Sequence, residues 1–446
     1  MGKKKVNLFK MITFTVCGII VLDTFVAPAA MGVSSITIWI ITAIFFFIPY
    51  GLINAELGAA YPEDGGIFVW VKRAFGELQA TLVGWYYWVN VAFWMPAVFI
   101  AFSTWFGYTF VPNMSLFASG IIAIFMCWVI VFIGIRGVEL SVAVTNVAAI
   151  CKVAVLVIFG LLGTLYFIQN GANNDFSFSN FIPSFDLNTF TFISAIVYNL
   201  LGFELISSIA SEIEEPEKNI PKMTIMAGVI IAVLYIVGTF GVLVAIPAEQ
   251  IDPLNGFQFA LEELTSVFGS FQGIAFKLIM ILTLFTLVSN MISWSMGGVE
   301  VLDAADFSKN SKILGVKHKK YNTPYGSYIL MGVISTGLII LNFSLSGDAN
   351  DAFWTILAFS FVIFLLPYLW LFPAAIKLRK MDASNRPYKV PGGEIGLYIS
   401  AILGFFFIAI SVFLLFYTGE FDILYHMTLI IGTAITTIIG LFLYKE

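Results

Sequence analysis

Two acidic residues stand inside otherwise apolar segments of this 446-residue chain. Asp23 lies in the first such segment, between Gly18 and Pro28, and Glu204 follows Gly202 in a later one. A carboxylate at bilayer depth is costly, so it usually faces a wet cavity or a cation. Glycine and proline let a membrane helix break and expose its backbone. The two segments therefore predict a binding site of negative charge.

The composition indicates the class of protein around these acids. Hydrophobic residues make up 60% of the chain and charged residues only 11%, which is typical of a polytopic membrane protein. The three cysteines lie in apolar runs, and the two histidines have no ligand-like spacing, so we expect no metal and no cofactor. A nucleophile–base pair of a membrane enzyme and the polar rings of a channel are also missing from the sequence pattern. These features favour a transporter that is not an enzyme.

The sequence contains twelve apolar stretches that are long enough to cross a bilayer, which takes about 20 residues each. They fall near residues 11–31, 35–60, 78–111, 116–135, 140–169, 189–211, 221–247, 271–303, 325–344, 349–372, 395–417 and 422–443. The predicted fold is therefore an all-α membrane protein with one transmembrane domain over residues 1–446.

The positive charges predict the orientation of these spans. Alternate loops, near 112–115, 170–188, 248–270, 345–350 and 418–421, contain no Lys or Arg, whereas the other connections and both termini are basic. The positive-inside rule then places both termini in the cytoplasm. We expect a multi-pass protein of a bacterial-type plasma membrane.

Two connecting segments carry distinctive motifs. Glu56-Leu-Gly-Ala-Ala-Tyr-Pro-Glu-Asp-Gly65-Gly66 follows the second span, and Glu212-Ile-Glu-Glu-Pro216 follows the sixth. In these motifs and their separation the chain closely resembles the amino acid–polyamine–organocation superfamily of secondary transporters. The resemblance implies two inverted five-helix repeats, near 11–169 and 189–372, with two additional helices near 395–443. It also implies broken helices 1 and 6 with the substrate between the breaks.

The first broken helix departs from the pattern of amino-acid carriers in this superfamily. Where those relatives have Gly-Ser-Gly, with free amides for the substrate carboxylate, this chain has Val21-Leu22-Asp23. Two like charges about 4 Å apart cost roughly 1 to 4 kcal/mol at effective dielectric constants of 80 to 20. An amine without a carboxylate turns this repulsion into attraction. We therefore predict exchange of agmatine- or putrescine-type amines.

An alternative remains open for the substrate. If Asp23 is protonated, or faces water beside the site, an amino acid still binds. The chain would then be an amino-acid exchanger or a proton symporter, including one that takes a precursor amino acid and returns its amine. Either way we expect a small-molecule substrate and lipid as partners, no nucleic acid, and we allow for a homodimer.

Several aromatic residues are candidates for contacts with an organic cation, because cation–π contacts contribute about 0.5–2 kcal/mol each. The resemblance implies an outer-gate role for Tyr198 and a place beneath the substrate for Trp294. Phe25, Phe203 and Trp94 are further candidates. The alternative is that these side chains face lipid or pack, since the chain contains 46 Phe, 17 Tyr and 10 Trp.

The resemblance assigns roles to two charged residues. Lys152 matches a family lysine whose ammonium replaces a sodium ion and braces helices 1 and 8, which implies sodium independence; the alternative is a snorkelling lysine. Glu204 matches an acid linked to pH response, and could trade a proton against a cation; the alternative is a hydrogen bond that holds the broken helix.

Further residues are expected to act near the cytoplasmic gate. Gly65 and Gly66 are predicted to shape a tight turn of the inner loop. Acidic residues at the cytoplasmic helix ends are predicted to meet Lys or Arg of the gate loops, in a structural or gating role. These acids are Glu56, Glu139, Glu300 and Asp303.

Overall fold

The structure of the protein is a computed structural model that describes residues 5–22, 24–184, 187–252, 255–307, 311–344, 349–382, 386–417 and 422–444. Apart from one isolated bridge between Val6 and Ile213, the regular elements in these ranges are all helices. Ten of the described helices are long and apolar enough to cross a membrane. The prediction of an all-α, multi-pass membrane protein is therefore confirmed.

The helices have the following bounds. The N-terminal part contains α1 (Leu8–Ile19), η1 (Ala27–Met31), α2 (Ser34–Thr42), η2 (Ala43–Phe47), α3 (Ile48–Ala60), α4 (Ile67–Phe75), α5 (Glu77–Phe110), α6 (Leu116–Arg136) and α7 (Val138–Asn170). The middle part contains η3 (Phe178–Phe181), α8 (Leu187–Asn199), α9 (Glu204–Ser207), η4 (Ala210–Glu212), α10 (Pro216–Ala245), η5 (Ala248–Gln250), α11 (Gly256–Thr265), η6 (Ser266–Phe271) and α12 (Gln272–Ala304). The C-terminal part contains α13 (Tyr325–Ser344), α14 (Ala349–Met381), α15 (Gly393–Phe416) and α16 (Ile423–Leu443).

Helices α2, η2 and α3 form one continuous helical segment from Ser34 to Ala60. The middle turn, η2, is a π-helix that ends two residues before Pro49. Proline has no N–H to donate to the preceding turn, so the helix loses a regular bond there and widens locally.

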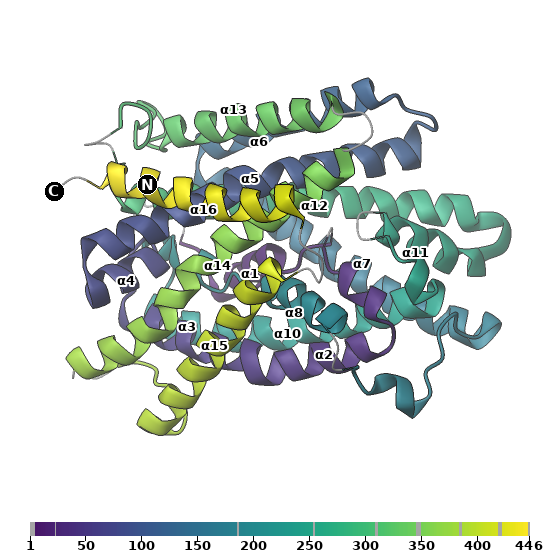
Figure 1. Cartoon of the computed structure of the whole chain (residues 1–446), viewed down its shortest axis with the longest axis horizontal. Coiled ribbons are helices and arrows are strands. Elements are labelled where there is room, and N and C mark those ends of the chain that lie inside the picture. Colours follow the sequence, from purple (N-terminus) through teal and green to yellow (C-terminus); the bar gives the residue numbers. More distant parts are fainter. Residues whose placement is uncertain are drawn as a thin grey trace.

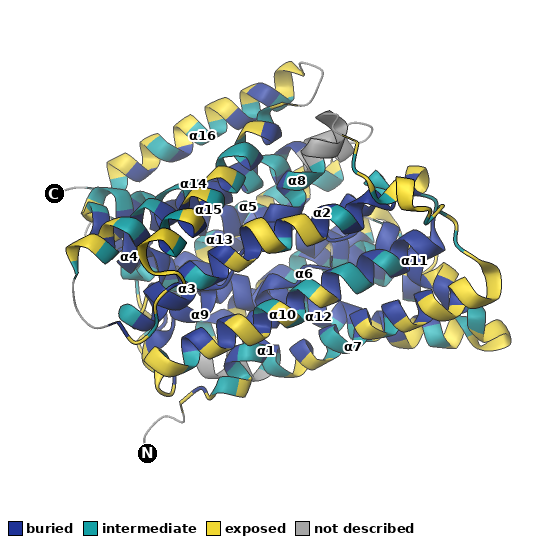
Figure 2. Cartoon of the chain, turned by 90° about the horizontal axis from the view of Figure 1, so that it is seen from below, coloured by how far each residue is buried: buried dark blue, intermediate teal, exposed yellow. Residues whose placement is uncertain are grey.

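The bundle has a buried centre and an outer surface of exposed apolar side chains. Helix α1 packs against α7, α10 and α12, and α5 packs against α12 and α14. Helices α6 and α13 run side by side along one edge (Figure 1). The outer helix α16 exposes large apolar side chains such as Ile423, Leu424 and Phe442, as the colouring of Figure 2 shows. Exposed apolar side chains on outer helices are what hydrocarbon contact requires.

The described chain begins and ends at the same end of the bundle, where α4 lies, and α11 marks the opposite end (Figures 1 and 2). Contacts agree with this placement. Val6 pairs with Ile213, and near the other terminus a Cβ at Gly440 would touch Trp85, shortly after the end of α4.

The first and sixth predicted spans, near 11–31 and 189–211, are not single helices of crossing length. The first is interrupted after α1, and the sixth is divided into α8 and the short α9. Both interruptions fall in the two segments that the sequence singled out by an acid and a glycine. The count of twelve crossings and the inverted repeat stay predictions.

Candidate functional site

The first interruption follows α1, whose last residue is Ile19. The next residue, Ile20, has extended backbone (φ −72°, ψ 116°), and the next helix along the chain is η1, where Pro28 is buried. The last carbonyls of a helix have no partner within it, and bilayer depth offers no water to replace one. Side chains of other helices must therefore hold this end of α1.

Lys152 of α7 holds the end of α1 most directly. Its buried ammonium donates to the carbonyl oxygens of Cys17 (2.6 Å) and Ile20 (2.5 Å) and to Oδ1 of Asn290 on α12. The lysine therefore joins α1, α7 and α12 in one contact. This is the geometry of a cation held by carbonyl and amide oxygens, and it is not that of a snorkelling side chain.

Trp294 of α12 contacts the same end of α1. Its indole Nε1 donates to the carbonyl oxygen of Gly18 at 2.8 Å. A Cβ added at Gly18 would lie 3.0 Å from a side-chain carbon of Leu205 in α9. The absence of a side chain at Gly18 therefore lets the ends of α1 and α9 approach each other.

Asp23, on which the predicted negative charge at this break depends, lies outside the described residues. The residues on either side of it are placed. Val21 and Leu22 are buried, and the hydroxyl of Thr24 donates to Oδ1 of Asn199 at the end of α8. The flanking residues therefore lie beside the second interruption.

The second interruption separates α8 from α9. Gly202 has φ +128°, a conformation that L side chains rarely adopt, and its missing Cβ would lie 3.1 Å from Ile19. The N–H groups of Gly202 and Phe203 donate to the hydroxyl oxygen of Tyr50 at 3.0 and 3.1 Å. Tyr50 of α3 thus satisfies two backbone amides that the broken helix leaves open.

Glu204 begins α9 and is 1% exposed. Three tyrosine hydroxyls donate to its carboxyl group. Tyr87 of α5 and Tyr368 of α14 donate to Oε1 at 2.7 and 2.5 Å, and Tyr50 donates to Oε2. The sequence had singled out the acid, but its partners come from three distant helices.

An aromatic cluster lies beside this acid. Trp294 lies against Tyr87 (ring centroids 6.2 Å apart), Trp94 (5.8 Å) and Phe364 (5.1 Å). Tyr198 contacts the same Phe364 at 5.2 Å. We call these five residues the aromatic cluster. The structure therefore brings together the three predicted residues Trp94, Tyr198 and Trp294.

Two other predicted aromatics lie elsewhere. Phe25 packs against Tyr235 and Phe257, with centroids 6.3 and 6.1 Å apart, and Phe203 stacks on Phe47 at 4.8 Å. Both side chains are buried. In this structure neither ring belongs to the aromatic cluster.

Sequence reasoning missed Tyr50, Tyr87, Phe364 and Tyr368 as neighbours of the acid. A weak signal existed in the spacing. Tyr87 and Trp94 are seven residues apart on α5, and Phe364 and Tyr368 are four apart on α14, so each pair shares a helix face. Nothing in one sequence tells such faces from the many other aromatic faces of this chain.

The loop between α3 and α4 lies against the second interruption. Gly65 and Gly66 have φ of +107° and +49°, and the N–H of Gly65 donates to the carbonyl oxygen of Ser208 at 3.1 Å. A Cβ at Gly66 would lie 3.0 Å from the carbonyl oxygen of Glu204. Both glycines are thus required by the turn and by the close backbone approach.

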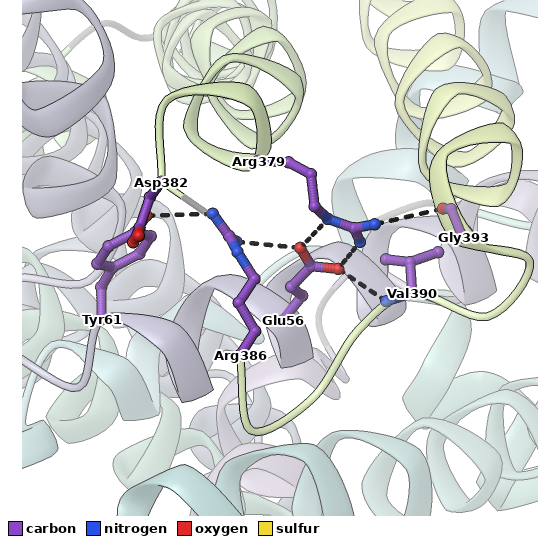
Figure 3. A network of polar contacts seen from close by, with 7 residues as sticks. All are labelled: Glu56, Tyr61, Arg379, Asp382, Arg386, Val390 and Gly393. Carbon is purple, nitrogen blue, oxygen red and sulfur yellow. Dashed lines mark hydrogen bonds and ion pairs between the residues drawn. The ribbon is translucent and has the colours of Figure 1, made fainter. Parts of the chain in front are cut away.

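A buried ionic cluster lies where α3, α14 and α15 meet (Figure 3). Glu56 accepts hydrogen bonds from Arg379 through both Nε and Nη2, from Arg386 (3.0 Å) and from the N–H of Val390 (2.7 Å). Arg386 also donates to the hydroxyl of Tyr61 at 3.1 Å. We call this the Glu56 cluster.

The Glu56 cluster agrees with the expectation that helix-end acids meet basic residues of the connecting loops. A second such pair joins Asp303 to Lys317 at 2.8 Å, and this hydrogen bond raises the pKa of the lysine. Glu300 lies one turn before Asp303 on α12, and the side chain of Glu139 lies outside the described part.

Membrane-crossing helices surround two interrupted segments, whose ends are held by side chains of other helices. This architecture is that of a membrane transporter and not of an enzyme. The comparisons with known proteins agree: the profile of the family described as "Amino acid permease" matches residues 6–441. The chain belongs to this amino acid permease family.

Relatives within the family carry amines and amino acids. A "Probable agmatine/putrescine antiporter" of Lactococcus lactis is 33% identical over alignments that cover 100% of this chain and 96% of the relative. A serine/threonine exchanger of Bacillus subtilis is 26% identical, covering 91% and 90%. A glutamate/gamma-aminobutyrate antiporter of Lactococcus lactis is 23% identical, covering 100% and 91%.

Proposed function

We propose that the protein exchanges small organic amines of the agmatine and putrescine type across the membrane, by alternating access and without sodium. The observation that carries the proposal is the position of Glu204. Its carboxyl group is buried next to the aromatic cluster, and Tyr87 belongs to both groups of contacts.

The chemistry of this neighbourhood suits a cation. A positively charged amine against the face of Trp294 or Tyr87 gains cation–π attraction, which increases when water is excluded. Glu204 lies one tyrosine away and would be the acid that attracts the amine. Asp23 would add a second acid in the first break, so a diamine would have one acid near each end.

The relatives support this substrate class without deciding it. The agmatine/putrescine antiporter aligns along the whole chain at 33% identity, whereas the two amino-acid exchangers reach 26% and 23%. The alternative is an amino-acid exchanger or proton symporter, including exchange of a precursor amino acid for its amine.

Lys152 supports sodium independence in this proposal. Its ammonium occupies a ring of oxygens from Cys17, Ile20 and Asn290, which is the kind of donor set that a bound sodium ion would need. A covalently tethered cation at this place leaves no role for a dissolved one. Transport of one amine is then coupled to transport of another amine in the opposite direction, and not to a sodium gradient.

The proposed architecture has twelve crossings, arranged as inverted repeats near 11–169 and 189–372 with extra helices near 395–443. The positions of α1 and α8–α9, interrupted at corresponding points, support this arrangement. We propose a bacterial-type plasma membrane, cytoplasmic termini and a homodimer as the setting.

Counterflow into proteoliposomes tests the substrate. Vesicles loaded with unlabelled agmatine are given radiolabelled agmatine, putrescine, arginine, ornithine or tyrosine outside. We expect rapid uptake of the amines and little uptake of the amino acids. Arginine methyl ester, which lacks the negative charge, should compete better than arginine. Uptake of amino acids alone would overturn the proposal.

The variant Asp23→Asn tests the proposed charge in the first break. Removing one carboxylate from the cation site should weaken agmatine binding at least about tenfold, which corresponds to about 1.4 kcal/mol. Glu249→Gln, an exposed acid, is the matched control and should not change affinity. An unchanged affinity in the first variant would remove Asp23 from the proposed contacts.

A further inference from the structure

Tyr235 of α10 connects the two interruptions through one hydroxyl group. The N–H of Val21 donates to this hydroxyl oxygen at 3.0 Å. The hydroxyl in turn faces the carbonyl oxygens of Ile19 (2.9 Å) and Asn199 (3.0 Å), the last residues of α1 and α8. One phenol oxygen thus serves the open backbone of both broken helices.

The ring that carries this hydroxyl has a fixed position. Tyr235 is fully buried and stacks on Trp39 of α2, with ring centroids 4.6 Å apart and planes 14° apart. Phe25 also packs against the ring of Tyr235, with centroids 6.3 Å apart. The stacking involves only the ring, so removing the hydroxyl leaves these packing contacts in place.

The amide of Val21 is the group whose availability matters for substrate choice. Open backbone amides at an interrupted membrane helix are the usual donors to a substrate carboxylate. A carboxylate oxygen and a phenol oxygen both act as acceptors toward such an amide. In this structure the acceptor is part of the protein, so a substrate that brings its own carboxylate finds this donor already bound.

We propose that Tyr235 is a specificity-determining residue, which excludes carboxylate-bearing molecules because its hydroxyl occupies the Val21 amide. The inference rests on the proposed function, since it explains how an amine is preferred over the amino acid from which it derives. Part of the preference for amines over amino acids then comes from the Val21 N–H, which is already bound to Tyr235 and cannot bind a carboxylate. Charge repulsion between acids of the site and the substrate carboxylate would add to this effect.

The variant Tyr235→Phe tests this assignment. Uptake and competition are measured for the pairs agmatine/arginine and putrescine/ornithine in proteoliposomes. We expect the variant to retain amine counterflow and its preference for the amine over the amino acid to fall at least about tenfold. Tyr86→Phe is the matched control, because the hydroxyl of this buried residue contacts Thr437 on α16 at 2.8 Å and contacts neither interruption. Its preference should equal that of the wild type.

A second substitution ties the gain to the proposed amide. Val21→Pro in the Tyr235→Phe background removes the N–H itself, so the newly gained affinity for arginine should disappear. Losing a buried hydroxyl also lowers the stability of the protein. Tyr235→Met, which likewise lacks the hydroxyl, is therefore measured in parallel with Tyr235→Phe. For all variants, binding is measured in detergent by the shift of melting temperature with each ligand.

The outcomes separate this inference from the proposed function. Wild-type counterflow of arginine as fast as that of agmatine would refute the proposed function. An unchanged preference in a folded Tyr235→Phe or Tyr235→Met carrier would refute only the inference. If neither Tyr235→Phe nor Tyr235→Met folds, the inference about specificity is also overturned, because the role of the Tyr235 hydroxyl would then be to maintain the fold.

Discussion

Neutralising Glu56 should destabilise the protein far more than neutralising an acid on its surface. The Glu56 side chain is 2% exposed, and the arginines that donate to it, Arg386 and Arg379, are 1% and 12% exposed. Glu56→Gln keeps the shape of the side chain but removes the negative charge that the buried Arg386 and the partly buried Arg379 share. Breaking a buried pair in this way costs about 3–5 kcal/mol.

The expected change in melting temperature follows from the length of the chain. Unfolding entropy is about 2 cal/mol/K per residue, which gives about 0.9 kcal/mol/K for 446 residues. A loss of about 3–5 kcal/mol then lowers the melting temperature by about 3–6 °C. Thermal unfolding of such proteins is usually irreversible, so all variants are heated at one scan rate in one detergent.

The matched control for this experiment is Glu63→Gln. Glu63 pairs with Arg73 at the surface, where the two side chains are 52% and 44% exposed, so the pair contributes at most about 1 kcal/mol. Its melting temperature should therefore stay within about one degree of the wild type. If Glu56→Gln melts within the same interval as this control, the reasoning from burial and charge is wrong.

Two further predictions concern the interruptions themselves. Lys152→Met removes the donor of the Cys17 and Ile20 carbonyls and should slow amine counterflow at least about tenfold, whereas Lys277→Met at an exposed position should not. A rate close to that of the wild type would contradict the bracing role. Gly202→Ala forces a side chain into φ +128° and should lower the melting temperature, whereas an added Cβ at Gly273 meets nothing within 4 Å. Equal melting temperatures of the two alanine variants would refute the strain argument.

Much of the fold could be predicted because helices in a membrane must satisfy their own backbone. An apolar run of sufficient length has one stable form in hydrocarbon, so the helix Leu116–Arg136 matches the predicted 116–135 and Tyr325–Ser344 matches 325–344. Interruptions in the first and sixth spans were also expected, because an acid at bilayer depth is costly and glycine lets a membrane helix break; α1 ends at Ile19 and α8 at Asn199.

The candidate site was predicted only in part. Glu204 and Lys152 stood out since charges at bilayer depth are rare, and Trp294 followed from the family resemblance. Tyr50, Tyr235 and their hydrogen bonds could not be found in this way. A tyrosine in an apolar helix is ordinary, and its hydroxyl acquires meaning only through the backbone group that it reaches.

The sequence by itself determined the class of protein and singled out two apolar segments that each contain an acid. These features depend on local composition, because the bilayer penalises each exposed charge and amide wherever it occurs along the chain. The tertiary structure alone decided which open amides and carbonyls are already occupied. Tyr235 and Val21 are 214 residues apart, and only the packing of α10 against α1 places one oxygen within 3.0 Å of that amide.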